Sequence, residues 1–279
     1  IAKPQMDPNN ELTQDSKDHV NEALYYTSSE YIGHILAAPF DQFGGKPTIS
    51  RETGQGLLEQ GPHNDGHDWI GTRIGKNRTM GTLRNAAADP MFYMHHGNID
   101  RIWSLYKKQQ PDPTGDWGKQ EYNFLDIDGS VITMSVQEII QDLNNVSYEK
   151  SKIKLLDNYV SSSVPSKFIL TQKIIDSSEV DVDIPADIFS GKPINLQITT
   201  GTISYTGKYT VKIFAGDKFV GKISFLDGEH REFYELKNVS HKFNVLLTNV
   251  PKGITKLRFV PPKRGNIKIS INSMEFKEL

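Results

Sequence analysis

Four of the eight histidines of this chain lie within residues 59–103, where they form a candidate metal site. His63 and His67 are four residues apart, so a helix places them on one face. His95 and His96 are adjacent, and on a helix only one of them can readily face the first pair. Three neutral imidazoles suit copper, zinc or iron better than magnesium or calcium. The stretch therefore predicts a three-histidine metal site.

The His63–His67 spacing taken alone is a weak signal. Two histidines at this spacing are more often ordinary surface or core residues than metal ligands. Where they do bind a metal, it is usually zinc. Zinc proteases of the familiar kind place a glutamate directly after the first histidine, whereas this chain has Asn64 there. The protease interpretation thus lacks its general base, and the metal site depends on a third imidazole about 29 residues after His67, in a chain without cysteine.

The residues around these histidines resemble the copper B half of plant polyphenol oxidases, the family of catechol oxidase and tyrosinase. The resemblance is carried by two runs, Glu59-x-x-Pro-His63-x-x-x-His67-x-Trp69-x-Gly71 and Asp89-Pro-x-Phe-Tyr-x-His-His-x-Asn-x-Asp-Arg-x-Trp103. The related oxygen-carrying haemocyanins of molluscs share this pattern. The resemblance implies that His63, His67 and His96 bind copper B and that His95 supports them without touching the metal.

The same resemblance points to residues around a phenol pocket. Glu59 lies one helical turn before His63 and could hold a water beside the metal and accept a phenol proton; the alternative is a helix-start glutamate favoured by the dipole. Asn64 could orient the same water. Asp68 either borders the substrate pocket or points into solvent, and both alternatives stay open.

A further pocket position is Leu83, thirteen residues before His96. Many plant members of the family place a phenylalanine there as a gate over copper B. A leucine leaves more room and removes a stacking partner for the substrate ring. This difference favours access of monophenols to the copper.

Local patterns predict the elements that carry these residues. Residues 1–36 have a loose helical period, and residues 39–56 read as a loop rich in Gly and Pro. One helix is expected to have Pro62 in its first turn, and another to start at Asp89-Pro90. The apolar residues around the histidine pair are expected in the core: Phe92, Tyr93, Met94, Ile99, Ile102, Trp103 and Leu105.

The second half of the chain has a different texture. After Pro165, short segments alternate polar and apolar residues with period two, separated by turn residues, which is typical of an antiparallel β-sandwich or barrel. The run His241-Lys-Phe-Asn-Val resembles the Lys-Phe-Asp-Val signature of the family's C-terminal domain, which covers the active site of the latent enzyme. No residue set in this half suggests chemistry.

These patterns together predict a multidomain α + β chain. Residues 1–110 are expected to be mainly helical, and the resemblance implies that they are a catalytic fragment, half of a type-3 copper four-helix bundle. Residues 111–164 are expected to be a linker region that includes a short helix within 135–156. Residues 165–279 are expected to form the β-rich shielding domain.

Composition excludes several classes of protein. The net charge of −2 and the mixed order of the charged residues, 24% of the chain, argue against a nucleic-acid or membrane-surface protein. No apolar run reaches the length of a transmembrane helix. The chain begins at Ile1 without a signal-like segment, so we expect a processed or truncated product.

The resemblance implies oxidation of o-diphenols, and possible hydroxylation of monophenols, to o-quinones by O₂ at a dinuclear copper centre. His19 and His34 are the only histidines before residue 63 and are expected to be surface or packed imidazoles. We therefore expect a separate N-terminal chain to carry copper A. Localisation in the plastid, in the thylakoid lumen, follows from the family, with the vacuole as an alternative. Two other functions stay open: a haemocyanin-like oxygen carrier and a non-catalytic fragment.

Overall fold

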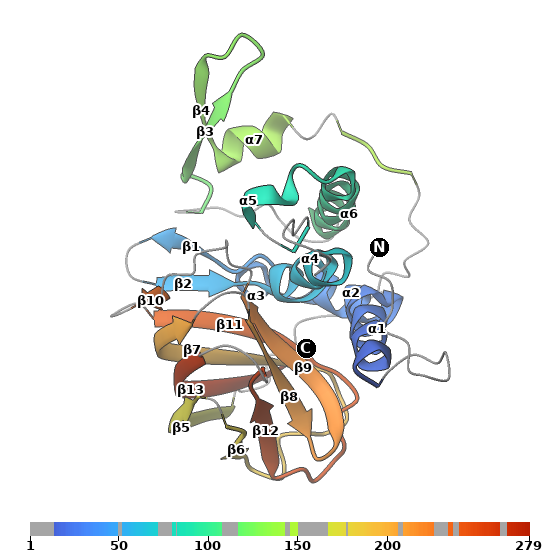
Figure 1. The fold of residues 1–279 in the computed structure, drawn as a ribbon, viewed down its shortest axis with the longest axis vertical. Helices are drawn as coiled ribbons and strands as arrows, with labels where there is room; N and C mark the ends of the chain where they lie inside the picture. The colour runs from blue at the N-terminus through green and yellow to red at the C-terminus, as the bar shows by residue number, and fades with distance from the viewer. Residues whose placement is uncertain are drawn as a thin grey trace.

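The computed structural model describes residues 14–49, 52–71, 80–81, 83–107, 117–142, 146–149, 167–176, 178–205, 209–225, 234–236, 240–262 and 267–279. In this part the chain is a mixed α + β protein, with its main helices lying over one end of two sheets (Figure 1). The predicted mixture of a helical first part and a β-rich second part is confirmed. No described helix is both long and apolar enough to cross a membrane.

The helices of the first part range from four to 18 residues, and polar side chains mark two of their starts. The Ser28 hydroxyl accepts a bond from the Tyr31 N–H at the start of α2, and the Asp89 carboxylate accepts one from Met91 at the start of α6. The helices are α1 (Gln14–Thr27), α2 (Ser29–Ala37), α3 (Phe40–Phe43), η1 (Glu59–His63), α4 (Asn64–Ile70), α5 (Leu83–Ala86) and α6 (Pro90–Lys107).

One apolar cluster holds α1, α2, η1 and α6 together. It includes Tyr26, Ile35, Leu57 and Ile102, each almost wholly buried. Ile102 and Leu105 are buried as predicted. The prediction for Tyr93 and Met94 is wrong, because they are 66% and 68% exposed on a face of α6 that no described element covers.

Residues 39–56 are not the predicted loop. They form α3 and two strands, β1 (Lys46–Ile49) and β2 (Glu52–Gln55), which pair with each other. Gly45, at φ +80°, makes the tight approach possible, since a Cβ there would lie 2.2 Å from the Gly54 carbonyl oxygen. β2 then pairs in parallel with β11 (Ser240–Leu247), so the main sheet begins in the first half of the chain.

The β-rich part consists of two sheets on one core. The larger sheet has the order β1-β2-β11-β7-β13-β5, with β10 also on β7, and the smaller has the order β6-β12-β8-β9. The remaining strands are β5 (Lys167–Ile175), β6 (Val180–Asp183), β7 (Ile194–Tyr205), β8 (Tyr209–Ala215), β9 (Lys218–Phe225), β10 (Tyr234–Leu236), β12 (Lys256–Val260) and β13 (Ile267–Glu278).

Period-two alternation explains this core. In β13, Ile267, Ile269 and Ile271 point inward, and they meet Val211 and Phe259 of the smaller sheet. All described pairings among the strands after residue 165 are antiparallel, and none of the described strands closes a barrel. Among the described strands, the parallel pairing is the one between β2 and β11.

The linker region contains a hairpin and a helix. β3 (Glu121–Leu125) pairs with β4 (Val131–Ser135), and α7 (Val136–Asp142) follows as the short helix predicted there. Ser135 and Glu138 bond each other's backbone N–H groups in a capping box. Residues 108–116 and 150–166 lie outside the described part, so the limits of the three predicted domains stay a prediction.

Candidate metal centre

The three histidines predicted as ligands come together between η1/α4 and α6. The candidate ligand atoms of His63, His67 and His96 all lie within 4.8 Å of one another, and the Nε2 atoms of His63 and His96 are 3.2 Å apart. Two nitrogens bound to one ion at about 2.0 Å lie roughly 3 to 3.5 Å apart. The His63–His96 pair matches this spacing, and His67 needs only a small approach.

Each of these imidazoles is held through its other nitrogen. The Nδ1 of His67 lies 2.8 Å from the Met80 carbonyl oxygen, and the Nδ1 of His96 lies 2.9 Å from that of Phe92. A carbonyl only accepts, so both Nδ1 atoms carry the proton. The Nδ1 of His63 is 3.1 Å from the Asn64 side-chain oxygen, which imposes the same tautomer.

This tautomer leaves the Nε2 lone pairs directed into the cluster. Two unprotonated nitrogens, those of His63 and His96, then face each other at 3.2 Å. Lone pairs at this distance repel unless a cation lies between them. A buried Nδ1–H bond that orients each ring is also the usual support of a metal-binding histidine. The donor set therefore fits a late transition metal such as copper or zinc.

Burial keeps the rings of His63 and His95 neutral. Loss of solvent, followed by the neighbouring imidazoles, lowers the pKa of His63 to about 3. Burial likewise lowers the pKa of His95 to about 4. Metal binding needs unprotonated imidazoles, so at neutral pH His63 need lose no proton.

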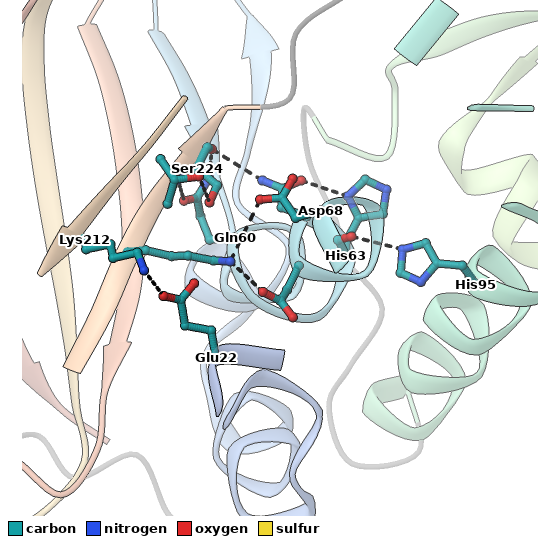
Figure 2. Close-up of polar contacts among 11 residues, drawn as sticks. Glu22, Gln60, His63, Asp68, His95, Lys212 and Ser224 are labelled. Atoms are coloured by element: carbon teal, nitrogen blue, oxygen red, sulfur yellow. Dashed lines mark hydrogen bonds and ion pairs between the residues drawn. The ribbon is translucent and has the colours of Figure 1, made fainter. Parts of the chain in front are cut away.

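His95 supports the site from the α6 side. Its Nε2 donates to the His63 carbonyl at 3.0 Å, and its ring centroid lies 5.0 Å from that of His67 (Figure 2). The ring fills the space beside Gly66, where an added Cβ would lie 2.2 Å from it. His96, not His95, is the member of the pair that joins the cluster.

The helix that carries His63 and His67 contains a wide turn. Pro62 was predicted in a first turn, but the segment is helical from residue 57 to residue 70, and Pro62 lies within η1, a π-type turn. Proline has no N–H to donate, and the wider turn accommodates this gap. Asn64 closes the turn by donating its backbone N–H to the carbonyls of Glu59 and Gly61.

Glu59 begins this turn and is partly buried. The Gln55 side-chain amide donates to its carboxylate at 3.0 Å. Burial raises the pKa of Glu59 to about 7, against which the Gln55 bond works. A carboxylate with such a pKa can accept and return a proton near neutral pH.

Asn64 and Asp68 lie on the side of the helix toward strand β9, and Asn64 links this side to the His63 ring. The Asn64 amide is 1% exposed; besides bonding His63 it donates to the Ser224 carbonyl at 3.4 Å. Asp68 is 7% exposed and lies 4.0 Å from the Lys222 ammonium. The alternative that Asp68 points into solvent is therefore wrong. The pocket role of Asp68 and the water-orienting role of Asn64 stay predictions.

Leu83, at the expected gate position, is the first residue of α5, and its side chain lies outside the described part. The role of Leu83 therefore remains a prediction. The same holds for His19, whose side chain is also not described, whereas His34 of α2 lies outside the three-histidine cluster.

Sequence patterns missed the partners on β9. The Lys222 ammonium is 2.5 Å from the Asp65 carboxylate and 5.0 Å from the centre of the Tyr26 ring. The Gln60 side chain makes two bonds of 3.0 Å with the backbone N–H and carbonyl of Ser224. Lys222, between the apolar residues Val220 and Ile223 in β9, was the available signal, and nothing in it indicated Asp65, 157 residues away.

Comparisons with known proteins confirm the resemblance. Residues 2–109 match the family described as the common central domain of tyrosinase. The chain is 30% identical over 105 residues to "Polyphenol oxidase latent form, chloroplastic" of Prunus armeniaca, covering 36% of this chain and 18% of that protein. It is 26% identical over 158 residues to "(+)-larreatricin hydroxylase, chloroplastic" of Larrea tridentata, covering 50% of this chain and 27% of that protein.

A solved structure extends the similarity to the whole fold. Latent apple tyrosinase aligns with a TM-score of 0.63 at 18% identity, over 98% of this chain and 67% of that one. At this identity the likeness speaks for the fold alone. The matched part of the chain spans about a fifth of the length of the Prunus armeniaca protein and about a quarter of the length of the Larrea tridentata hydroxylase.

Proposed function

We propose, from the match of residues 2–109 to the central domain of tyrosinase, that this chain carries the copper B site of a type-3 copper oxidase. The reaction is oxidation of o-diphenols to o-quinones by O₂. The observation that supports this most directly is the set of three imidazoles whose Nδ1–H groups are all bonded and whose Nε2 atoms converge. In this proposal the helices around them are half of the four-helix copper bundle.

The proposed roles follow from the contacts of each side chain. His63, His67 and His96 hold copper B. His95 keeps the turn at His63 in place by donating a hydrogen bond to the His63 carbonyl. A copper pair, when bound, supplies the exchange of two electrons between O₂ and a phenol. Glu59, with its pKa raised to about 7 by burial, accepts the proton of the substrate hydroxyl.

The proposal needs a second set of imidazoles that faces the first. In this proposal the copper A ligands come from sequence outside this chain, because His19 and His34 are the only histidines before His63 and the described part contains one cluster of three histidines. The relatives are longer proteins, and the comparisons give no support to a separate N-terminal chain as their source. The proposal therefore requires the complementary half without assigning it to a separate polypeptide.

Substrate range and location belong to the same proposal. Leu83 in place of a bulky aromatic gate favours monophenols as additional substrates, and the Larrea relative is named a hydroxylase. Leu83→Phe is expected to lower activity on monophenols more than on diphenols, and an equal loss on both would count against the gate. The relatives are named chloroplastic, which supports a plastid location; the thylakoid lumen and the vacuole are untested.

The test is to purify the protein as it occurs, count copper per mole, and assay catechol and tyrosine oxidation. Two coppers with quinone formation are the expected result. Reversible O₂ binding without quinone formation would support an oxygen carrier of haemocyanin type instead. No copper and no oxidation would indicate a non-catalytic fragment. A denaturing gel of the same sample shows whether the complementary half is a separate chain.

A further inference from the structure

The face of the metal-binding helix opposite its imidazoles is bound to the β-rich part of the chain. Gln60, Asn64 and Asp68 recur at four-residue intervals and so form one stripe along η1 and α4. Figure 2 shows Gln60 and Asp68 on the side of this helix that faces Ser224, with His95 across from them. His63 and His67, also four apart, form the imidazole stripe.

The contacts on this face come from two residues of β9 that alternate along the strand. Lys222 pairs with Asp65 at 2.5 Å and lies 4.0 Å from Asp68. The Ser224 backbone exchanges two hydrogen bonds with Gln60 and accepts a third from Asn64. Lys222 and Ser224, two residues apart and therefore on the same face of β9, contact the helix along its length.

The cluster is buried on every side. Lys222, Asp65, Asn64 and Gln60 are each at most 2% exposed. Burial by itself lowers the pKa of Lys222, but Asp65, Asp68 and Glu22 together hold that pKa above its usual value, so the ammonium stays charged. A charge buried in this way is stable only while its partners remain in place.

One path of hydrogen bonds leads from β9 to a metal ligand. The Ser224 carbonyl accepts from the Asn64 amide, and the oxygen of the same amide accepts from the Nδ1 of His63. The orientation and tautomer of His63 therefore depend on a strand of the β-rich part. A cover over the active-site mouth would contact the imidazole side, whereas these contacts are on the other side.

We propose that β9 positions the metal-binding helix, through Lys222 on Asp65 and Asp68 and through Ser224 on Gln60 and Asn64, so that the β-rich part is a structural component of the metal centre. This inference rests on the proposed function for the identity of the metal. It assigns to the β-rich part a role beyond shielding. Lys222 acts as a positioning residue and touches neither metal nor substrate.

The test is a titration of the whole chain with Cu²⁺ alone, against a competing chelator. Lys222→Met is expected to weaken copper binding by about tenfold or more, as loss of a supporting contact does at other metal sites. Lys212→Met is the matched control, since the described ion pair of Lys212 across this interface is with Glu22 of α1, outside η1 and α4. The control is expected to bind copper within about twofold of wild type.

A second measurement separates positioning from general stability. The ¹⁵N shifts of the histidine rings in the metal-free chain report which nitrogen carries the proton. Wild type is expected to show the Nδ1–H tautomer at His63, and Lys222→Met a mixture of tautomers there. His96, held by the Phe92 carbonyl within α6, is expected to stay unchanged and serves as the internal reference.

Two outcomes overturn the proposal: wild-type copper affinity with an unchanged His63 ring in Lys222→Met, or an equal loss in Lys212→Met. Where Lys222→Met does not fold, the neutral triple variant Asp65→Asn, Asp68→Asn, Lys222→Met decides. It is expected to fold and to bind copper about tenfold more weakly, and full affinity overturns the proposal. A wild-type chain that binds no copper counts against the proposed function instead. The ¹⁵N shifts of the His63 ring in the metal-free chain still test whether β9 positions the helix.

Discussion

The two faces of the helical segment 57–70 are both buried, yet they hold opposite kinds of groups. One face presents His63 and His67, and burial lowers the pKa of His63 to about 3 so that it stays neutral. The other face presents Asp65 and Asp68, which keep Lys222 charged in spite of its burial. Burial penalises charge on both faces, and the neighbours of each group decide whether the charge survives.

The difference has a chemical consequence. A face of neutral imidazoles without a counter-charge is prepared for a cation from outside the chain. A face on which cation and carboxylates already compensate each other is prepared only to hold the helix in position. The predictions below test each face in turn, from the largest expected effect to the smallest.

Removal of an imidazole tests the neutral face. His63→Ala removes one of the three proposed ligands, and copper binding by the chain is expected to fall by more than the roughly 10- to 100-fold that loss of a supporting residue causes. Equilibrium titration with Cu²⁺ measures it. His34→Ala, which removes an imidazole outside the cluster, is the control and should bind as wild type. Unchanged binding by His63→Ala would mean that the ligand assignment is wrong.

Removal of the buried cation tests the charged face. Lys222→Met leaves two buried carboxylates without their partner, and the free energy of unfolding is expected to fall by about 3–5 kcal/mol. Lys212→Met should cost less, because it unpairs one carboxylate in place of two and Lys212 is itself 35% exposed, although Glu22 is only 7% exposed. Urea denaturation of both variants measures the difference. Equal costs would show that the Lys222 cluster contributes no more than the partly exposed Lys212–Glu22 pair.

The pH dependence of stability distinguishes the two faces further, through Glu59. Its pKa in the folded chain, about 7, is above its ordinary value near 4.5, so between these pH values the folded state binds the extra proton. Stability contributed by this proton is present below about pH 4.5 and is lost as pH rises through 7, by at most about 1.4 kcal/mol per pH unit. Glu59→Gln is expected to remove this slope, as measured by urea denaturation from pH 4.5 to 8; an unchanged slope would contradict the raised pKa.

The contact between Gly66 and His95 gives the smallest expected effect. Alanine at position 66 favours a helix by up to about 1 kcal/mol, but its Cβ would lie 2.2 Å from the His95 ring. We expect the clash to dominate, with a net loss of about 1–2 kcal/mol in the free energy of unfolding. In a His95→Ala background the same change should be neutral or stabilising, and thermal melts of the four proteins measure the coupling. Additive effects would show that the two residues do not touch.

Prediction from sequence succeeded where contacts are local. The four-residue spacing of His63 and His67 is enough to put both on one side of a helix. Around His95 and His96, many residues of the run Asp89–Trp103 match the family pattern at fixed spacing. It failed where long-range packing decides. Residues 46–49 and 52–55 form strands because β2 pairs with β11 and β1 pairs with β2. Tyr93 and Met94 are exposed because no described element packs on their side of α6.

The sequence by itself therefore determined the candidate ligands and the mixed α + β class, since these depend on spacing and alternation within single elements. Only the tertiary structure decided which tautomer each imidazole takes, which of His95 and His96 joins the cluster, and where Asp68 points. It also brought Lys222 to Asp65 across 157 residues. The physical reason is that helix and strand periods constrain neighbours within an element, whereas the pairing of buried charges depends on how distant elements pack.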